Sequence, residues 1–132
     1  MKMDLNVPKE HTPVSCIAFS ELGKFMAAAW TGSPTTRLYS LHKGCQHVDM
    51  LEGEHKSTTV NKLAFDKFGN FLASATDTGV NLFYYRQPNK PMGHIKSQAP
   101  VTAVQFDMSQ ASTGKELCYR TNEGTVHVAK RV

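Results

Sequence analysis

The chain has 132 residues, of which 40% are hydrophobic and 20% charged. This size and composition are those of one globular domain and exclude a disordered or fibrous chain. The formal net charge is +4, but the Lys and Arg residues are scattered, with no cluster longer than Lys130-Arg131. Because nucleic-acid binders gather basic residues into a patch, direct nucleic-acid binding is not expected. The longest apolar run, residues 25–30, is far too short to span a bilayer, so no membrane partner is expected.

The cysteine content and the first residues bear on the cellular compartment. Cys16, Cys45 and Cys118 are an odd number without paired spacing, which favours a reduced intracellular protein. The opening residues 1–4 are not followed by the apolar segment of a signal peptide. We therefore expect a cytoplasmic or nuclear protein.

An internal repeat is the strongest signal in the sequence. Residues 14–29 (VSCIAFSELGKFMAAA) align with residues 60–75 (VNKLAFDKFGNFLASA) at an offset of 46, and seven of the sixteen positions are identical. Chance matching would give roughly one identity. A third copy begins at Val101, where VTAVQFDMS aligns with VNKLAFDKF at an offset of 41. This period is close to the 40–45 residues of a four-stranded propeller blade.

Each copy predicts the same succession of strand, turn, strand, turn and strand. Glycine beside Lys or Asn in the first turn favours a hairpin, and a continuously apolar second strand with small residues fits a strand covered on both faces. The elements expected in chain order are strand 14–19, turn 20–24, strand 25–28 and strand 37–39; then strand 60–65, turn 66–70, strand 71–74 and strand 80–83; then strand 101–106, turn 107–115 and strand 126–128.

The pattern predicts an all-β fold, a β-propeller fragment of about three four-stranded antiparallel blades. The blades are expected at residues 12–51, 58–90 and 99–130, with residues 1–11 as the outer strand of an adjoining blade. A β-sandwich has similar strand spacing, but it does not explain the identity between copies. Since propellers have four to eight blades, three would leave two apolar faces open. We therefore expect pairing with missing blades or with a second copy of the chain.

The middle copy resembles the WD-repeat family, through His55, Val60–Asp66, Gly69, Phe71–Ser74 and Asp77–Phe83. The name-giving Trp-Asp pair is replaced in the three copies, by Tyr39-Ser40, Phe83-Tyr84 and Ala129-Lys130. The order of the copies is most similar to the C-terminal blades of the pre-mRNA-splicing factor nineteen family. Those proteins are U-box ubiquitin ligases whose propeller receives substrates and partners. This chain does not resemble their U-box or coiled coil.

The resemblance implies a WD-type propeller that is nuclear, non-catalytic and free of cofactors, and that binds proteins through loops on one ring face. It also implies a structural hydrogen-bond network between His55 and Asp77, although Phe83 offers no donor in place of the family's Trp. His11 and His94 hold the equivalent histidine positions of the other copies. The alternatives are a WD-repeat adaptor of another intracellular complex and a small basic RNA-binding β-domain. The latter would present stacking aromatics, whereas the recurring phenylalanines hold core positions.

No motif supports catalysis. Residues 40–43 and 112–115 match Ser-x-x-Lys, but the further motifs of that chemistry are missing, as are phosphate-binding loops. His42, Cys45 and His47 form the one metal-like cluster; a structural zinc site needs four ligands, and the alternative places these residues in an exposed turn and outer strand.

The expected partner-binding face is centred on Trp30, which opens the loop 31–34 between the second and third strands of the first copy. A Trp there has the area and partial polarity of an interface anchor. The alternative is that Trp30 packs between blades as core. The full set of expected partner-binding residues is Trp30, Arg37, His55, Lys56, Asp77, His94, Lys96, Asn122 and Glu123.

Overall fold

The computed structural model describes residues 13–33, 35–41, 46–52, 59–68, 70–84, 91–107 and 116–130. Across these ranges the chain forms β-strands and no α-helix, so the predicted all-β class is confirmed. None of the described segments is a helix with the length and apolarity needed to cross a membrane.

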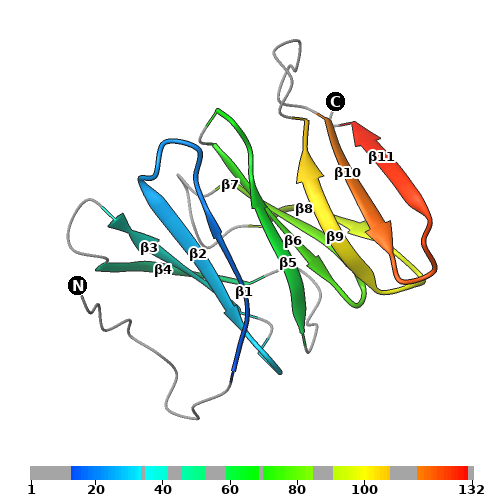
Figure 1. Ribbon diagram of the computed structural model, residues 1–132, viewed down its shortest axis with the longest axis horizontal. Helices are drawn as coiled ribbons and strands as arrows, with labels where there is room; N and C mark the ends of the chain where they lie inside the picture. The colour runs from blue at the N-terminus through cyan, green and yellow to red at the C-terminus, as the bar shows by residue number, and fades with distance from the viewer. Residues whose placement is uncertain are drawn as a thin grey trace.

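The strands form three antiparallel sheets that follow one another along the chain (Figure 1). The first sheet contains β1 (Val14–Phe19), β2 (Phe25–Trp30), β3 (Thr35–Ser40) and β4 (Gln46–Glu52). The second contains β5 (Val60–Phe65), β6 (Phe71–Thr76), β7 (Gly79–Tyr84) and β8 (Pro91–Lys96). The third contains β9 (Val101–Phe106), β10 (Glu116–Thr121) and β11 (Val126–Lys130). Strand order within each sheet is sequential, as in the blades of a propeller.

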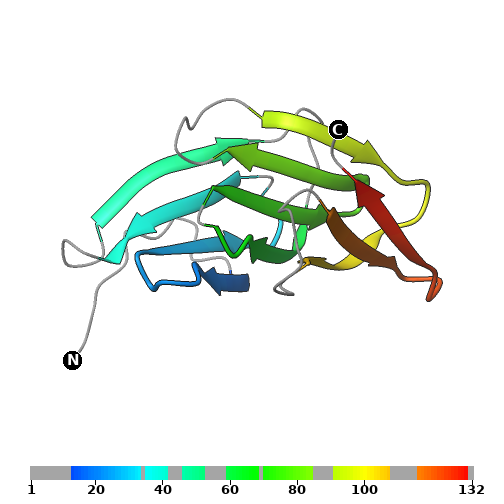
Figure 2. The same cartoon turned by 90° about the horizontal axis from the view of Figure 1, so that it is seen from above.

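The sheets are arranged as adjoining blades. Their first strands, β1, β5 and β9, pack side by side. Figure 2 shows these three strands along one edge of the molecule, with the outer strands β4 and β8 along the opposite edge. The predicted fragment of a propeller is therefore confirmed.

Small side chains on the second strands allow the sheets to pack closely. Ala27 and Ala29 of β2 are fully buried in a core cluster with Phe65 of the next sheet, and Ala73 and Ala75 of β6 share a second cluster with β9. Because successive residues of a strand point to opposite faces, an apolar second strand such as Phe25–Trp30 serves two interfaces at once.

The turn after the first strand is closed in the same way in two sheets. In the first sheet the backbone N–H groups of Lys24 and Phe25 donate to Ser20 Oγ at 3.1 and 3.0 Å. In the second sheet Asp66 Oδ1 accepts from the N–H groups of Asn70 and Phe71 at 2.8 and 2.9 Å. Both side chains are buried, so their oxygens replace water for these donors.

This equivalence predicts how Asp66 tolerates substitution. Asp66→Ala should lower the free energy of unfolding by about 1–3 kcal/mol, because two N–H groups lose their acceptor. Asp66→Ser should stay within about 1 kcal/mol of wild type, because a hydroxyl fills the role that Ser20 fills and removes the buried Oδ2, which has no hydrogen-bond partner. Urea unfolding of the two variants checks this, and equal losses would show that Asp66 acts otherwise.

One predicted boundary is corrected by the structure. The second blade was expected to end at residue 90, but β8 (Pro91–Lys96) is the outer strand of that sheet and pairs with β7. Pro91 and Gly93 are poor strand formers, so the sequence did not predict a strand here. Both are nevertheless tolerated in an outer strand, and Pro is tolerated at the first residue of a strand. The outer strand expected within residues 1–11 lies outside the described residues.

Candidate partner-binding rim

The turns between the second and third strands lie at the same end of the three sheets. We call this end of the sheets the rim. Two interblade hydrogen bonds fix this alignment: Ser15 Oγ donates to the carbonyl of Val60 at 2.9 Å, and Asn61 Nδ2 donates to the carbonyl of Val101 at 2.9 Å. They join the starts of the first strands, which pair with the ends of the second strands. In Figure 1 the end of β2 and the turn between β10 and β11 lie toward the lower part of the view.

Trp30 lies at the rim end of β2 but is not exposed. It is only 2% accessible and belongs to a core cluster with Met26, Ala28 and Tyr39. The guanidinium of Arg37 lies over its ring, with Cζ 5.7 Å from the centroid, which is within the range of a cation–π contact. This placement agrees with the alternative role of Trp30 as core. The half-buried Arg37, rather than the indole, reaches the surface at this position.

Asp77 is exposed in the turn between β6 and β7. Its Oδ1 accepts a hydrogen bond from Asn61 Nδ2 at 3.0 Å, and the same amide group holds the carbonyl of Val101 in the third sheet. The buried position that the resemblance implies for Asp77 is therefore wrong, because its side chain lies at the surface across the boundary between two blades. His55 itself lies outside the described residues.

His94 of β8 is held by a buried amide. Its Nδ1 is 2.8 Å from Oδ1 of Asn81, the residue opposite it on β7. The adjacent Gly79 has a φ of 146°, and a Cβ there would collide with the carbonyl oxygen of Ile95 and lie 3.0 Å from His94 Nε2. Only glycine fits this approach, so the turn that presents Asp77 has a fixed geometry.

The remaining described residues of the expected face are exposed at the rim. Lys96 ends β8 beside the 77–78 turn, and Asn122 and Glu123 form the turn between β10 and β11. Together with Asp77 and Arg37 they give a rim of mixed charge that crosses all three sheets. Lys56 lies outside the described residues.

The metal candidates cannot be assembled from what the structure describes. His42 and Cys45 lie outside the described residues, and for His47 only the backbone in β4 is described. Among the described residues no group of three or more His, Cys, Asp and Glu side chains is placed to hold a metal ion.

Cys16 is a free thiol at the interface between the first two sheets. Burial raises its pKa above the ordinary value, outweighing the lowering effects of the Ser15 hydrogen bond and the Lys62 charge. The thiol therefore stays protonated near neutral pH and is a poor nucleophile.

Sequence reasoning missed the residues that align the rim. Ser15, Asn61 and Thr102 each follow the first Val of their copy, and the first two donate to the next blade. The signal available in the sequence was a polar residue that recurs directly after the first Val of each copy.

Comparison with known proteins agrees with this architecture. The family profile described as "WD domain, G-beta repeat" matches residues 4–40 and 45–83, more than half of the chain. The chain therefore belongs to the WD-repeat family, whose propellers are generally non-catalytic modules for protein interaction. No curated protein sequence matches it.

Solved structures give a similar fold at low sequence identity. The β-propeller domain of Cps50 (Swd1) from Myceliophteria thermophila has a TM-score of 0.76 and 18% identity, over 90% of this chain and 34% of that one. A chain of the Mitotic Checkpoint Complex has a TM-score of 0.77 and 19% identity, over 93% of this chain and 35% of that one. The chain thus spans about a third of the length of these propeller chains.

Proposed function

We propose that this chain is the partner-binding part of a nuclear scaffold, the receptor propeller of a splicing-associated ubiquitin ligase. The observation that carries the proposal is the rim, where exposed residues from different blades meet on one edge of a WD-repeat fold. Asp77, Lys96 and Glu123 are exposed there, and Asn61 and Gly79 fix the turn beneath Asp77. The assignment to splicing is supported by the similarity of the copies to the C-terminal blades of the splicing factor nineteen family.

The arrangement suits recognition rather than catalysis. Mixed charges on a fixed backbone set the orientation and the rate of association of a protein partner. Trp30 is buried in the core and does not contact a partner. Hydrophobic anchors for the interface would therefore come from the partner or from blades beyond the three of this chain. Further blades or a second copy of the chain are proposed as additional partners.

The rim predicts a charge-dependent capture of protein partners. Glu123→Arg should reduce the recovery of splicing-associated ubiquitin-ligase components from nuclear extract by about fivefold or more, as expected when an interface contact becomes repulsive. Quantitative mass spectrometry on the immobilised chain measures this. The matched control is Glu21→Arg, at a glutamate that is also exposed and lies in the turn at the opposite end of the first sheet.

Other outcomes distinguish the alternatives. Equal recovery by both variants would contradict a role for the rim, and rim-dependent capture of an unrelated assembly would favour an adaptor of another complex. Filter binding with single-stranded RNA at two salt concentrations tests the basic RNA-binding alternative. Micromolar affinity with a steep salt dependence would contradict a scaffold that binds only protein.

A further inference from the structure

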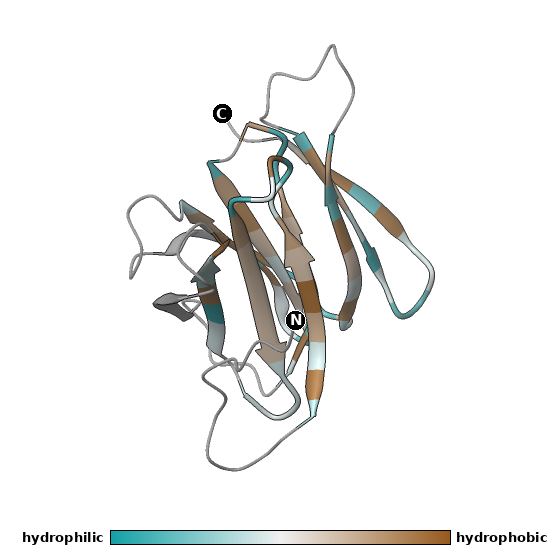
Figure 3. Ribbon diagram, turned by 60° about the vertical axis from the view of Figure 1, so that its left-hand side comes forward, coloured by the Kyte–Doolittle hydropathy of each residue, from teal (hydrophilic) through white to brown (hydrophobic). Residues whose placement is uncertain are grey.

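Each sheet has two faces, and one of them carries equivalent apolar residues on the first strand. We call this the leading face. In the second and third sheets these residues are buried: Val60, Leu63 and Phe65, then Val101, Val104 and Phe106. In the first sheet their equivalents Val14, Ile17 and Phe19 are 51%, 52% and 57% exposed. Figure 3 brings this side forward and shows the hydrophobic colouring along β1 and β2. The first strand of the first sheet is therefore open at three positions that are covered in the other two sheets. On the neighbouring strands of the same face, Met26, Ala28, Trp30 and Tyr39 are already buried.

The two buried phenylalanines show what such a face packs against. Phe65 shares a core cluster with Ala27 and Leu38 on the opposite, or trailing, face of the first sheet, with Ala18 packed beside them. Phe106 shares a cluster with Ala73 of the second sheet, with Ala64 and Leu82 packed beside it. In both sheets the three trailing positions are neighbours by strand register. A phenylalanine thus sits each time on the same three positions of the preceding blade.

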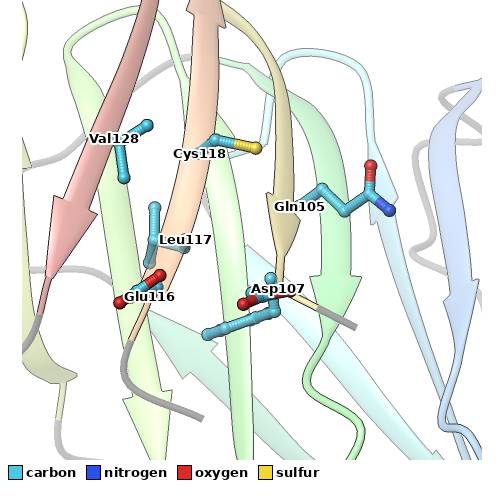
Figure 4. Close-up of a pocket in the computed structure, with 7 residues that line it drawn as sticks. Gln105, Asp107, Glu116, Leu117, Cys118 and Val128 are labelled. Atoms are coloured by element: carbon cyan, nitrogen blue, oxygen red, sulfur yellow. The ribbon is translucent and has the colours of Figure 1, made fainter. Parts of the chain in front are cut away.

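In the third sheet two of these three positions are exposed and the third is half-buried. By register they are Gln105, Cys118 and Val128, which lie opposite one another on β9, β10 and β11. They line a hollow of about 370 Å³, together with Phe106, Asp107, Glu116 and Leu117 (Figure 4). Val128 is 73% exposed. The hollow therefore lies where the phenylalanine of a following blade packs.

A hydrogen bond gives a second, independent indication. Ser15 donates to the carbonyl of Val60, and Asn61 donates to the carbonyl of Val101, so each donor reaches the first Val of the following blade. Thr102 holds the same position in the third sheet. It is directed within its own sheet, where Oγ1 donates to the carbonyl of Arg120 at 3.2 Å. The acceptor equivalent to Val60 and Val101 in a second copy is the carbonyl of Val14.

We propose that two copies of this chain bind through these two faces. Phe19 of one copy enters the hollow formed by Gln105, Cys118 and Val128 of the other, and Thr102 turns to the carbonyl of Val14. Because the two faces differ, each copy contributes its leading face to one contact and its hollow to the other. Two such contacts close a ring of about six blades, which is within the known range of blade numbers in propellers. A second copy fits because its leading face has the exposed Val14, Ile17 and Phe19 that this register requires. The contact does not depend on which proteins the rim binds.

The pairing is tested by the mass of the chain in solution. Light scattering and sedimentation should give about twice the 14.6 kDa of one chain. Phe19→Asp should raise the dissociation constant of the pair by at least about 30-fold, the loss expected on removing an interface anchor. The matched control is Phe68→Asp, the same change at a phenylalanine that is 50% exposed in a turn of the second sheet, and it should leave the dimer intact. Glu123→Arg should also remain dimeric, which separates this proposal from the function of the rim.

A mixing experiment tests the direction of the contact. Val128→Asp alters the hollow, and it should dissociate the pair as Phe19→Asp does. An equimolar mixture of the two variants should form a heterodimer of intermediate affinity, because one of its two contacts is unaltered. Circular dichroism melting confirms that each variant is folded. The proposal would be overturned by a monomeric wild type, by a dimeric Phe19→Asp variant or by a mixture that stays monomeric. In the first case, the hollow would instead bind a blade that does not come from a second copy of the chain.

Discussion

Replacing Phe65 by alanine should lower the free energy of unfolding by about 3–5 kcal/mol. Phe65 is 7% exposed and lies in the cluster that joins the first two sheets, with Ala27, Leu38 and Leu72. Removing its ring leaves a cavity between two blades whose backbones cannot close over it, because the interblade hydrogen bond from Ser15 to Val60 holds them in place. The loss would be at least about a fifth of the stability of an ordinary domain.

Denaturant unfolding measures this effect against two neighbours in the chain. Phe68→Ala removes the same ring from a half-exposed turn position, and Lys67→Ala alters the adjacent side chain. Both should stay within about 0.5 kcal/mol of wild type. Similar losses for Phe65→Ala and Phe68→Ala would mean that the repeat register places the wrong phenylalanine between the sheets.

Replacing Trp30 by alanine should also lower the free energy of unfolding by about 3–5 kcal/mol. The indole is buried against Met26, Ala28 and Tyr39, and Arg37 covers its ring. Arg37→Gln removes the cation–π contact with Trp30, and loss of this contact should lower the free energy of unfolding by about 0.5–1 kcal/mol. If Trp30 were instead an interface anchor, Trp30→Ala would abolish partner capture while leaving the unfolding curve unchanged. This result would contradict the burial of Trp30 in the core.

The repeat made most of the fold predictable. A first strand with Val and Phe, a polar turn and an apolar second strand recur at a fixed spacing, and the structure confirms strands at these positions. The strand at Pro91–Lys96 was not predicted, because an outer strand packs on few neighbours and can contain Pro and Gly. Local sequence carries no hydrophobic pattern for such a strand, and pairing with β7 decides its structure.

The candidate site was less predictable, because it depends on contacts between blades. Exposure of Asp77, Lys96 and Glu123 follows from their place in turns and at a strand end. Burial of Trp30 does not, since the continuously apolar sequence of β2 does not show how far each of its two faces is covered. The hydrogen bond from Asn61 to Asp77 joins residues that are sixteen positions apart in the sequence. The second hydrogen bond from Asn61, to the carbonyl of Val101, forms only when two sheets stack.

The feature of the fold on which the other conclusions depend is the arrangement of the chain in three separate antiparallel sheets stacked as propeller blades, rather than in two sheets of a sandwich. Through-bond NMR couplings across backbone hydrogen bonds test it most directly, because they show which strands are paired. Among the described residues, backbone pairing is expected only within residues 13–52, 60–97 and 100–130, with Phe65 contacting Ala27 through side chains alone. Backbone amide–carbonyl pairing between strands of different repeats, such as β1 with β5, would contradict it.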